Sequence, residues 1–242
     1  MKFLFYIAVL GLVVIVAFIL GQRNLVGNVT DSKKTNVSIP RVGSSPPVPQ
    51  KKKKIICNQT DKPNDLENGK FNIGFFGVGS TGVSTVINNL RGLSPNEEDA
   101  ADIGQNGITK KTTGYKFNDE IMLWDHIAIQ NLTYYSPLQY YDAIFLCHSS
   151  TPENSPLKDF HEYLKKCYTK KIYFINTKIK ETIKNNLDDY KKQKEETLKE
   201  SKDRFITFYG IDEEQLFFAD KNKNGEYITK LRKFIEELPN KN

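Results

Sequence analysis

The sequence predicts an α/β fold with a mainly parallel sheet for residues 67–242, and two observations support this. The first is a short apolar strand at residues 71–76 that passes through a glycine-rich turn into a helix beginning near Val83. The second is the alternation of strand and helix patterns from that turn onward, which is typical of a parallel sheet with helices on both faces. Such sheets bind ligands at the carboxyl ends of their strands, and the glycine turn lies at one of these ends.

Each further element is predicted from its own pattern. The first helix has one apolar face, made by Val83, Val86, Ile87 and Leu90 at helical spacing. Short apolar runs predict more strands at residues 119–124, 141–147, 171–176 and 216–219. Periodic segments predict helices at residues 155–167, 178–203 and 224–238, the middle one long and highly charged.

Charge is distributed unevenly along the chain. The formal net charge is +6 and the mean hydropathy is −0.51, but residues 24–66 alone carry eight Lys and Arg against three Asp. This polar, proline-containing segment is predicted to be a disordered basic stalk. A basic segment outside the folded domain favours acidic membrane lipid over nucleic acid as a partner, and a solvated charge run is the alternative.

An apolar run at residues 3–20 precedes the stalk and has about the minimum length of a membrane-spanning helix. We expect residues 1–23 to form a single-pass signal-anchor, with a cleaved signal peptide as the alternative. More Lys and Arg follow the run than precede it, which favours a cytosolic domain, although most of them lie at the edge of the relevant window. Four N-glycosylation sequons, at Asn28, Asn36, Asn58 and Asn131, oppose that orientation.

The three cysteines and three histidines show no metal-binding spacing. Because Cys57, Cys147 and Cys167 are odd in number and widely spaced, we expect neither a disulfide framework nor a zinc site, which fits a reducing compartment. His126, His148 and His161 are expected in loops or on the surface, and Trp124 in the core.

The glycine turn has the spacing of a phosphate-binding loop, Gly77-x-x-x-x-Gly82-Val83-Ser84. Glycines allow backbone N–H groups to surround a phosphate, a helix N-terminus adds a positive dipole, and Ser84 would bind Mg²⁺. Val83 replaces the lysine of the pattern. The residues predicted to contact nucleotide here are Gly77, Gly79, Ser80, Thr81, Gly82, Val83, Ser84 and Thr85. A tight turn kept for packing is the alternative.

Three later segments match further parts of a nucleotide site. Thr112 lies between the glycine turn and the second predicted strand, and Asp125 ends that strand; both are predicted Mg²⁺ ligands with Ser84, although Asp125 could instead cap the strand. Thr177 and Lys178 follow a later strand and are predicted to contact nucleotide. In a GTPase, the aspartate at the strand end belongs to an Asp-x-x-Gly motif, and here Ala128 replaces its glycine. The later strand is followed by an Asn/Thr-Lys-x-Asp motif whose aspartate reads guanine, and here Lys180 replaces that aspartate.

The order of these motifs resembles the interferon-inducible, immunity-related GTPase (IRG) family over about residues 70–239. Segments Ile87–Leu93, Thr112-Thr113, Trp124-Asp125 and Thr177-Lys178 carry the resemblance. It implies a P-loop NTPase fold of the Ras-like G-domain type, binding of GTP or GDP with Mg²⁺, and association with intracellular membranes. Val83 resembles a regulatory branch of the family that has an apolar residue in place of the P-loop lysine.

The replaced residues set the functional expectation. Loss of the lysine should weaken nucleotide binding by roughly 10–100-fold, and loss of the guanine-reading carboxylate should weaken base preference. We identify no catalytic residue and expect negligible hydrolysis. We therefore expect a membrane-anchored, degenerate G domain that regulates or docks to related GTPases or to itself. The alternatives are an active GTPase that uses substitute residues such as Lys178 or Lys180, and a secreted, glycosylated domain without enzymatic activity.

Overall fold

The structure is a computed structural model, and it describes residues 57, 66, 69–103, 111–126, 129, 138–190 and 193–241. All of these belong to one compact unit, residues 53–242. The predicted span at residues 3–20 and nearly all of the predicted stalk lie outside the described residues. Among the helices that are described, none has the length and apolar character needed to cross a membrane.

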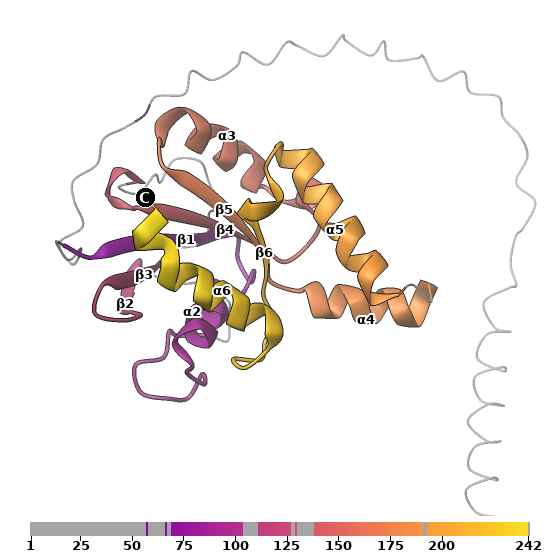
Figure 1. Cartoon of the computed structure of the whole chain (residues 1–242), viewed down its shortest axis with the longest axis horizontal. Helices are drawn as coiled ribbons and strands as arrows, with labels where there is room; N and C mark the ends of the chain where they lie inside the picture. The colour runs from indigo at the N-terminus through magenta and orange to yellow at the C-terminus, as the bar shows by residue number, and fades with distance from the viewer. Residues whose placement is uncertain are drawn as a thin grey trace, which may run out of the picture. The chain divides into compact units, whose positions relative to one another are not determined.

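A six-stranded sheet forms the centre of the domain, in the order β2-β3-β1-β4-β5-β6 (Figure 1). Its strands are β1 (Phe71–Gly77), β2 (Thr113–Lys116), β3 (Ile121–Asp125), β4 (Ala143–His148), β5 (Lys171–Asn176) and β6 (Leu216–Phe218). All neighbours pair in parallel except β2, which runs antiparallel to β3. The mainly parallel α/β fold is thus confirmed. Strand β1 lies inside the sheet, between β3 and β4, so the turn that follows it lies at the middle of the carboxyl edge.

Helices cover both faces of the sheet (Figure 1). They are α2 (Val83–Arg91), α3 (Leu157–Cys167), α4 (Ile179–Tyr190), α5 (Lys194–Tyr209) and α6 (Glu226–Glu237). Short 3₁₀ turns lie at Leu138–Tyr140, Pro152–Asn154, Glu213–Gln215 and Leu238–Lys241. The single helix expected at residues 178–203 is wrong, because two helices, α4 and α5, occupy this region. Each has its own apolar contacts: Ile179 and Ile183 of α4 pack near Tyr227, whereas α5 buries Phe205 against another cluster.

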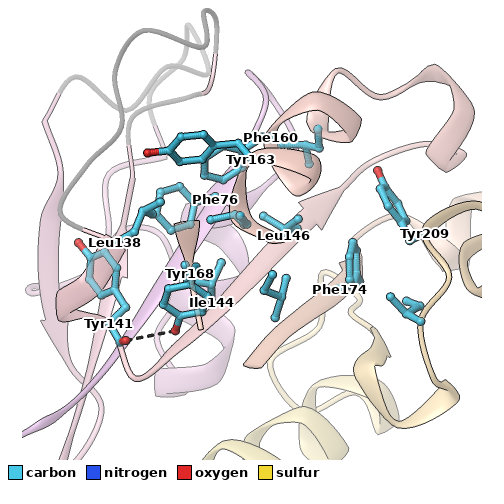
Figure 2. Close-up of a cluster of buried hydrophobic side chains, with 14 of the residues drawn as sticks. Phe76, Leu138, Tyr141, Ile144, Leu146, Phe160, Tyr163, Tyr168, Phe174 and Tyr209 are labelled. Atoms are coloured by element: carbon cyan, nitrogen blue, oxygen red, sulfur yellow. Dashed lines mark hydrogen bonds between the residues drawn. The ribbon is translucent and has the colours of Figure 1, made fainter. Parts of the chain in front are cut away.

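Two apolar cores follow from the alternation of side chains along the strands. On one face, Phe75, Phe145 and Ile175 pack with residues of α2 and α6. On the other, aromatic residues from the strands meet α3 and α5, and Figure 2 shows this cluster. There the Tyr168 hydroxyl donates a hydrogen bond to the Tyr141 carbonyl oxygen at 3.1 Å, which satisfies a polar group inside the core.

All three histidines are buried; His126 lies in a loop as expected, whereas His148 ends β4 and His161 lies in α3, contrary to the expectation of a loop or surface position. His126, His148 and His161 are each 5% exposed or less. His126 stacks on Phe76 with ring centroids 4.0 Å apart, while His148 and His161 both contact the ring of Tyr209 edge-on. Trp124 is buried in the core as predicted, and its indole N–H donates to Asn72.

The expectation of no disulfide is also wrong. Cys57 is bonded to Cys167, the last residue of α3, and their Cα atoms are 5.3 Å apart. Residues 110 positions apart in sequence are brought together by the fold, and no spacing pattern in the chain signals this. Cys147 is free and buried in β4.

Candidate functional site

The loop between β1 and α2 is wound tightly. Thr81 is buried, and its hydroxyl donates to the Val78 carbonyl oxygen at 2.8 Å. Gly77 must lack a side chain, because a Cβ there would collide with the Thr81 hydroxyl. Ser80 and Gly82 adopt the left-handed conformation, with φ of 63° and 83°, a backbone conformation that glycine favours.

The predicted contact residues of this loop differ in accessibility. Gly79 and Ser80 are exposed at its tip, whereas Ser84 and Thr85 are half-buried in the first turn of α2. The first turn of a helix presents backbone N–H groups that lack helical partners, and these groups can bind an anion. The loop therefore combines a helix N-terminus with an accessible backbone at the middle of the sheet edge.

Ser84 and Asp125 meet at this edge, as the sequence predicted for two Mg²⁺ ligands. The Ser84 hydroxyl donates to Asp125 Oδ2 at 2.6 Å. Asp125 is 1% exposed and ends β3, which pairs directly with β1. A hydroxyl and a carboxylate are oxygen ligands of the kind that Mg²⁺ prefers, so the donor set fits this ion. Among the described residues, no group of three or more His, Cys, Asp or Glu could hold a metal, so phosphate oxygens or water would complete the coordination.

Thr112, the third predicted Mg²⁺ ligand, lies one step away. Its hydroxyl is 3.3 Å from His126 Nδ1, and the neighbouring Thr113 pairs with Asp125 in the β2–β3 ladder. His126 Nε2 is 2.7 Å from the Tyr141 hydroxyl, and burial lowers the pKa of His126 to about 3. The ring is thus neutral at pH 7. His126, the residue after Asp125, lies between the Thr112 hydroxyl and the buried Tyr141 hydroxyl. Ala128, where the sequence lacks a motif glycine, lies outside the described residues.

Val83, at the position of the P-loop lysine, is turned into the protein. It is 8% exposed and belongs to the apolar core beneath α2. One of its methyl groups lies close to Gly77, near enough to contact any side chain there. The position therefore contributes packing and no positive charge.

Thr177 connects the end of β5 to the glycine loop. Its hydroxyl donates to the Thr81 carbonyl oxygen at 2.6 Å and also lies 3.0 Å from the His148 carbonyl oxygen. Lys178 follows and is half-buried, and its backbone N–H donates to Asn176 Oδ1. The structure therefore places Thr177 beside the loop, in a bond to the loop backbone, and its predicted contact with nucleotide stays a prediction.

Lys180, at the position of a guanine-reading aspartate, has an acidic partner that the sequence analysis missed. Its ammonium lies 3.1 Å from Asp220 Oδ2, in the loop between β6 and α6. The Lys180 side chain is 56% exposed, whereas the Asp220 side chain is fully buried. Asp220 Oδ1 accepts the Asn222 backbone N–H at 2.9 Å. One signal was available, because Asp220 follows β6 at the sheet edge where the other motif residues lie.

Comparisons with known proteins agree with this arrangement. A family model described as Interferon-inducible GTPase (IIGP) matches residues 50–207. The chain is 26% identical over 196 residues to mouse Interferon-inducible GTPase 1, covering 74% of this chain and 47% of the relative. It is 32% identical over 143 residues to mouse Interferon-gamma-inducible GTPase 10, covering 54% and 33%. The chain thus spans about half or less of the length of these relatives.

Solved structures of GTP-binding proteins are also similar. A probable GTP-binding protein engB is 14% identical with a TM-score of 0.48, covering 71% of this chain and 99% of that chain. A GTP-binding protein from Sulfolobus solfataricus in complex with GDP is 21% identical with a TM-score of 0.44, covering 70% and 52%. The strand order and the glycine loop, described above, establish the fold independently of these similarities.

Proposed function

Because the chain belongs to the interferon-inducible GTPase family, we propose that its G domain binds GTP or GDP weakly with Mg²⁺ and hydrolyses little or none of it. In this proposal the domain regulates or docks to related GTPases, or to a second copy of itself, and residues 3–20 attach it to a membrane. The observation that carries the nucleotide part is the 2.6 Å hydrogen bond between Ser84 and Asp125 beside the glycine loop.

The phosphate end of the site retains most of its parts. Ser84 is positioned by Asp125, the loop is fixed to β5 through Thr177, and α2 directs its N-terminus toward the same place. Bound Mg²⁺ would neutralise phosphate charge, with Ser84 and Asp125 as the residues that hold it. The proximity of these groups in the free protein supports binding without the lysine.

The loss of the lysine sets the expected weakness. A charge-assisted hydrogen bond to phosphate contributes roughly 1.5–3 kcal/mol, so its absence should weaken affinity by roughly 10–100-fold. Val83 does not compensate, because its side chain is buried in the core. An affinity weakened to this degree is still measurable.

The base end supports a weak preference for guanine. A carboxylate at the reading position accepts two N–H groups of guanine, and Lys180 has only donors to offer. Its ammonium is instead engaged by Asp220, whose side chain is fully buried and so does not face a bound base. A site without the matching polar partner discriminates poorly between bases. We therefore propose that GTP and ATP compete at similar concentrations.

Hydrolysis requires a group that positions water and a charge that stabilises the transferred phosphoryl group. The lysines of the alternative, active GTPase offer limited help: Lys180 is paired with Asp220, and Lys178 is half-buried beside Asn176. The geometry thus favours binding over turnover.

Titration of the full chain with fluorescent GTP, with and without Mg²⁺, tests the proposal. We expect saturable, Mg²⁺-dependent binding that Ser84→Ala weakens, because that variant removes a metal ligand. Thr229→Ala is the matched control, since its hydroxyl bonds only to its own helix at the Gly225 carbonyl oxygen and lies in α6. Unsaturated signals that are identical with GTP, ATP and buffer would contradict nucleotide binding. Phosphate release above the Ser84→Ala background would contradict the absence of hydrolysis.

A further inference from the structure

We infer that Cys57 and Cys167 form a structural disulfide in the cell, and that the G domain therefore faces an oxidising compartment, either the secretory lumen or the exterior. This is opposite to the orientation expected from the charges around residues 3–20. The inference does not rest on nucleotide binding, and either proposal can fail without the other.

The geometry of the pair supports the bond. Cys57 is exposed, Cys167 is half-buried at the end of α3, and their Cα atoms are 5.3 Å apart, within the usual range for a disulfide. The bond ties the segment that leads into the domain to a helix on the face of the sheet opposite α2 and α6.

The distribution of all three cysteines also supports an oxidising compartment. Cys147, the remaining one, is completely buried in β4, and burial raises the pKa of its thiol, so it is unreactive. Each cysteine near the surface is thus paired, and the one free thiol is sealed in the core. This pattern suits an oxidising compartment, because disulfides persist there and are rare in the cytosol.

The sequence before the domain bears on the compartment as well. The apolar run at residues 3–20 would carry the domain into the secretory pathway if it is cleaved as a signal peptide, or if it remains as an anchor with its N-terminus in the cytosol. Asn58, adjacent to Cys57, begins one of the four sequons, and sequons are modified only on the lumenal side. The opposing charges are Arg23, Lys33, Lys34 and Arg41; Arg23 lies beside the run, Lys33 and Lys34 lie toward the edge of the window that sets orientation, and Arg41 lies outside it.

The bond would form by thiol–disulfide exchange with an oxidised dithiol protein of the compartment. The thiolate of one cysteine attacks a sulfur of that protein's disulfide, which gives a mixed disulfide and releases one thiol. The second cysteine then attacks the sulfur of the first. The Cys57–Cys167 bond forms, and the partner protein leaves as a dithiol. It has gained the two electrons and two protons that the two cysteines lost.

The test uses the full chain with a C-terminal tag in animal cells, quenched in acid and alkylated with N-ethylmaleimide before digestion without reductant. We expect mass spectrometry to find the peptide linked through Cys57 and Cys167. Cys147 should be the one alkylated cysteine, and it should react only after the protein is denatured. In a Cys57→Ser variant, Cys167 should become alkylated. Recovery of alkylated Cys57 and Cys167 from nearly all of the wild-type protein would overturn the inference.

A second measurement reports the compartment without relying on the cysteines. Protease is added to intact microsomes, with detergent-treated microsomes as the control. Protection of the tagged domain, or its appearance in the culture medium, supports the inference. Digestion of the domain in intact microsomes overturns it, even if the disulfide is found.

Discussion

Restoring a lysine at position 83 tests whether the loop from Gly77 to Ser84 still holds a phosphate. Val83→Lys replaces a side chain that is 8% exposed in the apolar core. Removing its methyl groups from the core should cost about 1.5–3 kcal/mol of folding stability, less whatever the lysine stem recovers by lying along the same surface. The new ammonium should contribute roughly 1.5–3 kcal/mol to phosphate binding, which is roughly 10–100-fold in affinity.

The assay pairs a thermal melt with titration of fluorescent GTP. The melt establishes that the variant is folded, and the titration measures the gain. Val83→Met is the matched control, because it keeps an apolar side chain of similar reach and adds no charge. We expect Val83→Lys to bind more tightly than both wild type and Val83→Met. A folded Val83→Lys protein with the affinity of Val83→Met would refute the view that the loop surrounds a phosphate.

Three further predictions concern the stability of the fold. Gly77→Ala should lose about 1–3 kcal/mol in urea unfolding, because its Cβ collides with the Thr81 hydroxyl, whereas Gly79→Ala, with no atom within 4 Å of its Cβ, should lose far less; equal losses would contradict the loop geometry. Burial lowers the pKa of His126, His148 and His161 to about 3, 3 and 4, so the folded protein keeps them neutral while the unfolded chain takes up protons below about pH 6.5. The free energy of unfolding should therefore be constant above pH 7 and fall as the pH drops from 6.5 toward 4, by up to roughly 1.4 kcal/mol per pH unit for each histidine. The fall should be shallower in His161→Phe, and equal slopes in the two proteins would contradict burial of that ring. Reduction of the Cys57–Cys167 bond should lower the urea midpoint, with a chain-entropy limit of roughly 4–5 kcal/mol for a loop of this length, and Cys57→Ser should show no response to reductant.

Much of the fold could be predicted because strands and helices leave local patterns. Strand β5 has its predicted bounds, Lys171–Asn176, around the apolar run at residues 172–175, and β1 and α2 were located by the glycine turn between them. Strand β2 was missed because Thr113–Lys116 is short and half-exposed at the edge of the sheet, so it has no apolar run. The position of β2 is set by its pairing with β3, and a local sequence pattern does not show such a pairing.

The candidate site was predicted in part for the same reason. Asp125 ends β3, and Ser84 lies in the first turn of the helix that follows β1, the parallel neighbour of β3, so topology brings the two side chains together. The Lys180–Asp220 pair and the Cys57–Cys167 bond each join residues that are far apart in sequence, and neither has a characteristic spacing. Contacts of this kind become visible only when the whole chain is folded.

The central claim is that the phosphate end of the nucleotide site persists while the base end does not discriminate. Competition against fluorescent GTP on the full chain, with Mg²⁺ present, measures both ends at once by comparing unlabelled GTP, ATP and inorganic tripolyphosphate. The account predicts displacement by all three, with GTP and ATP effective at concentrations within about tenfold of each other. Displacement by GTP alone would contradict the lost base reading, and no saturable binding at all would contradict the retained phosphate site.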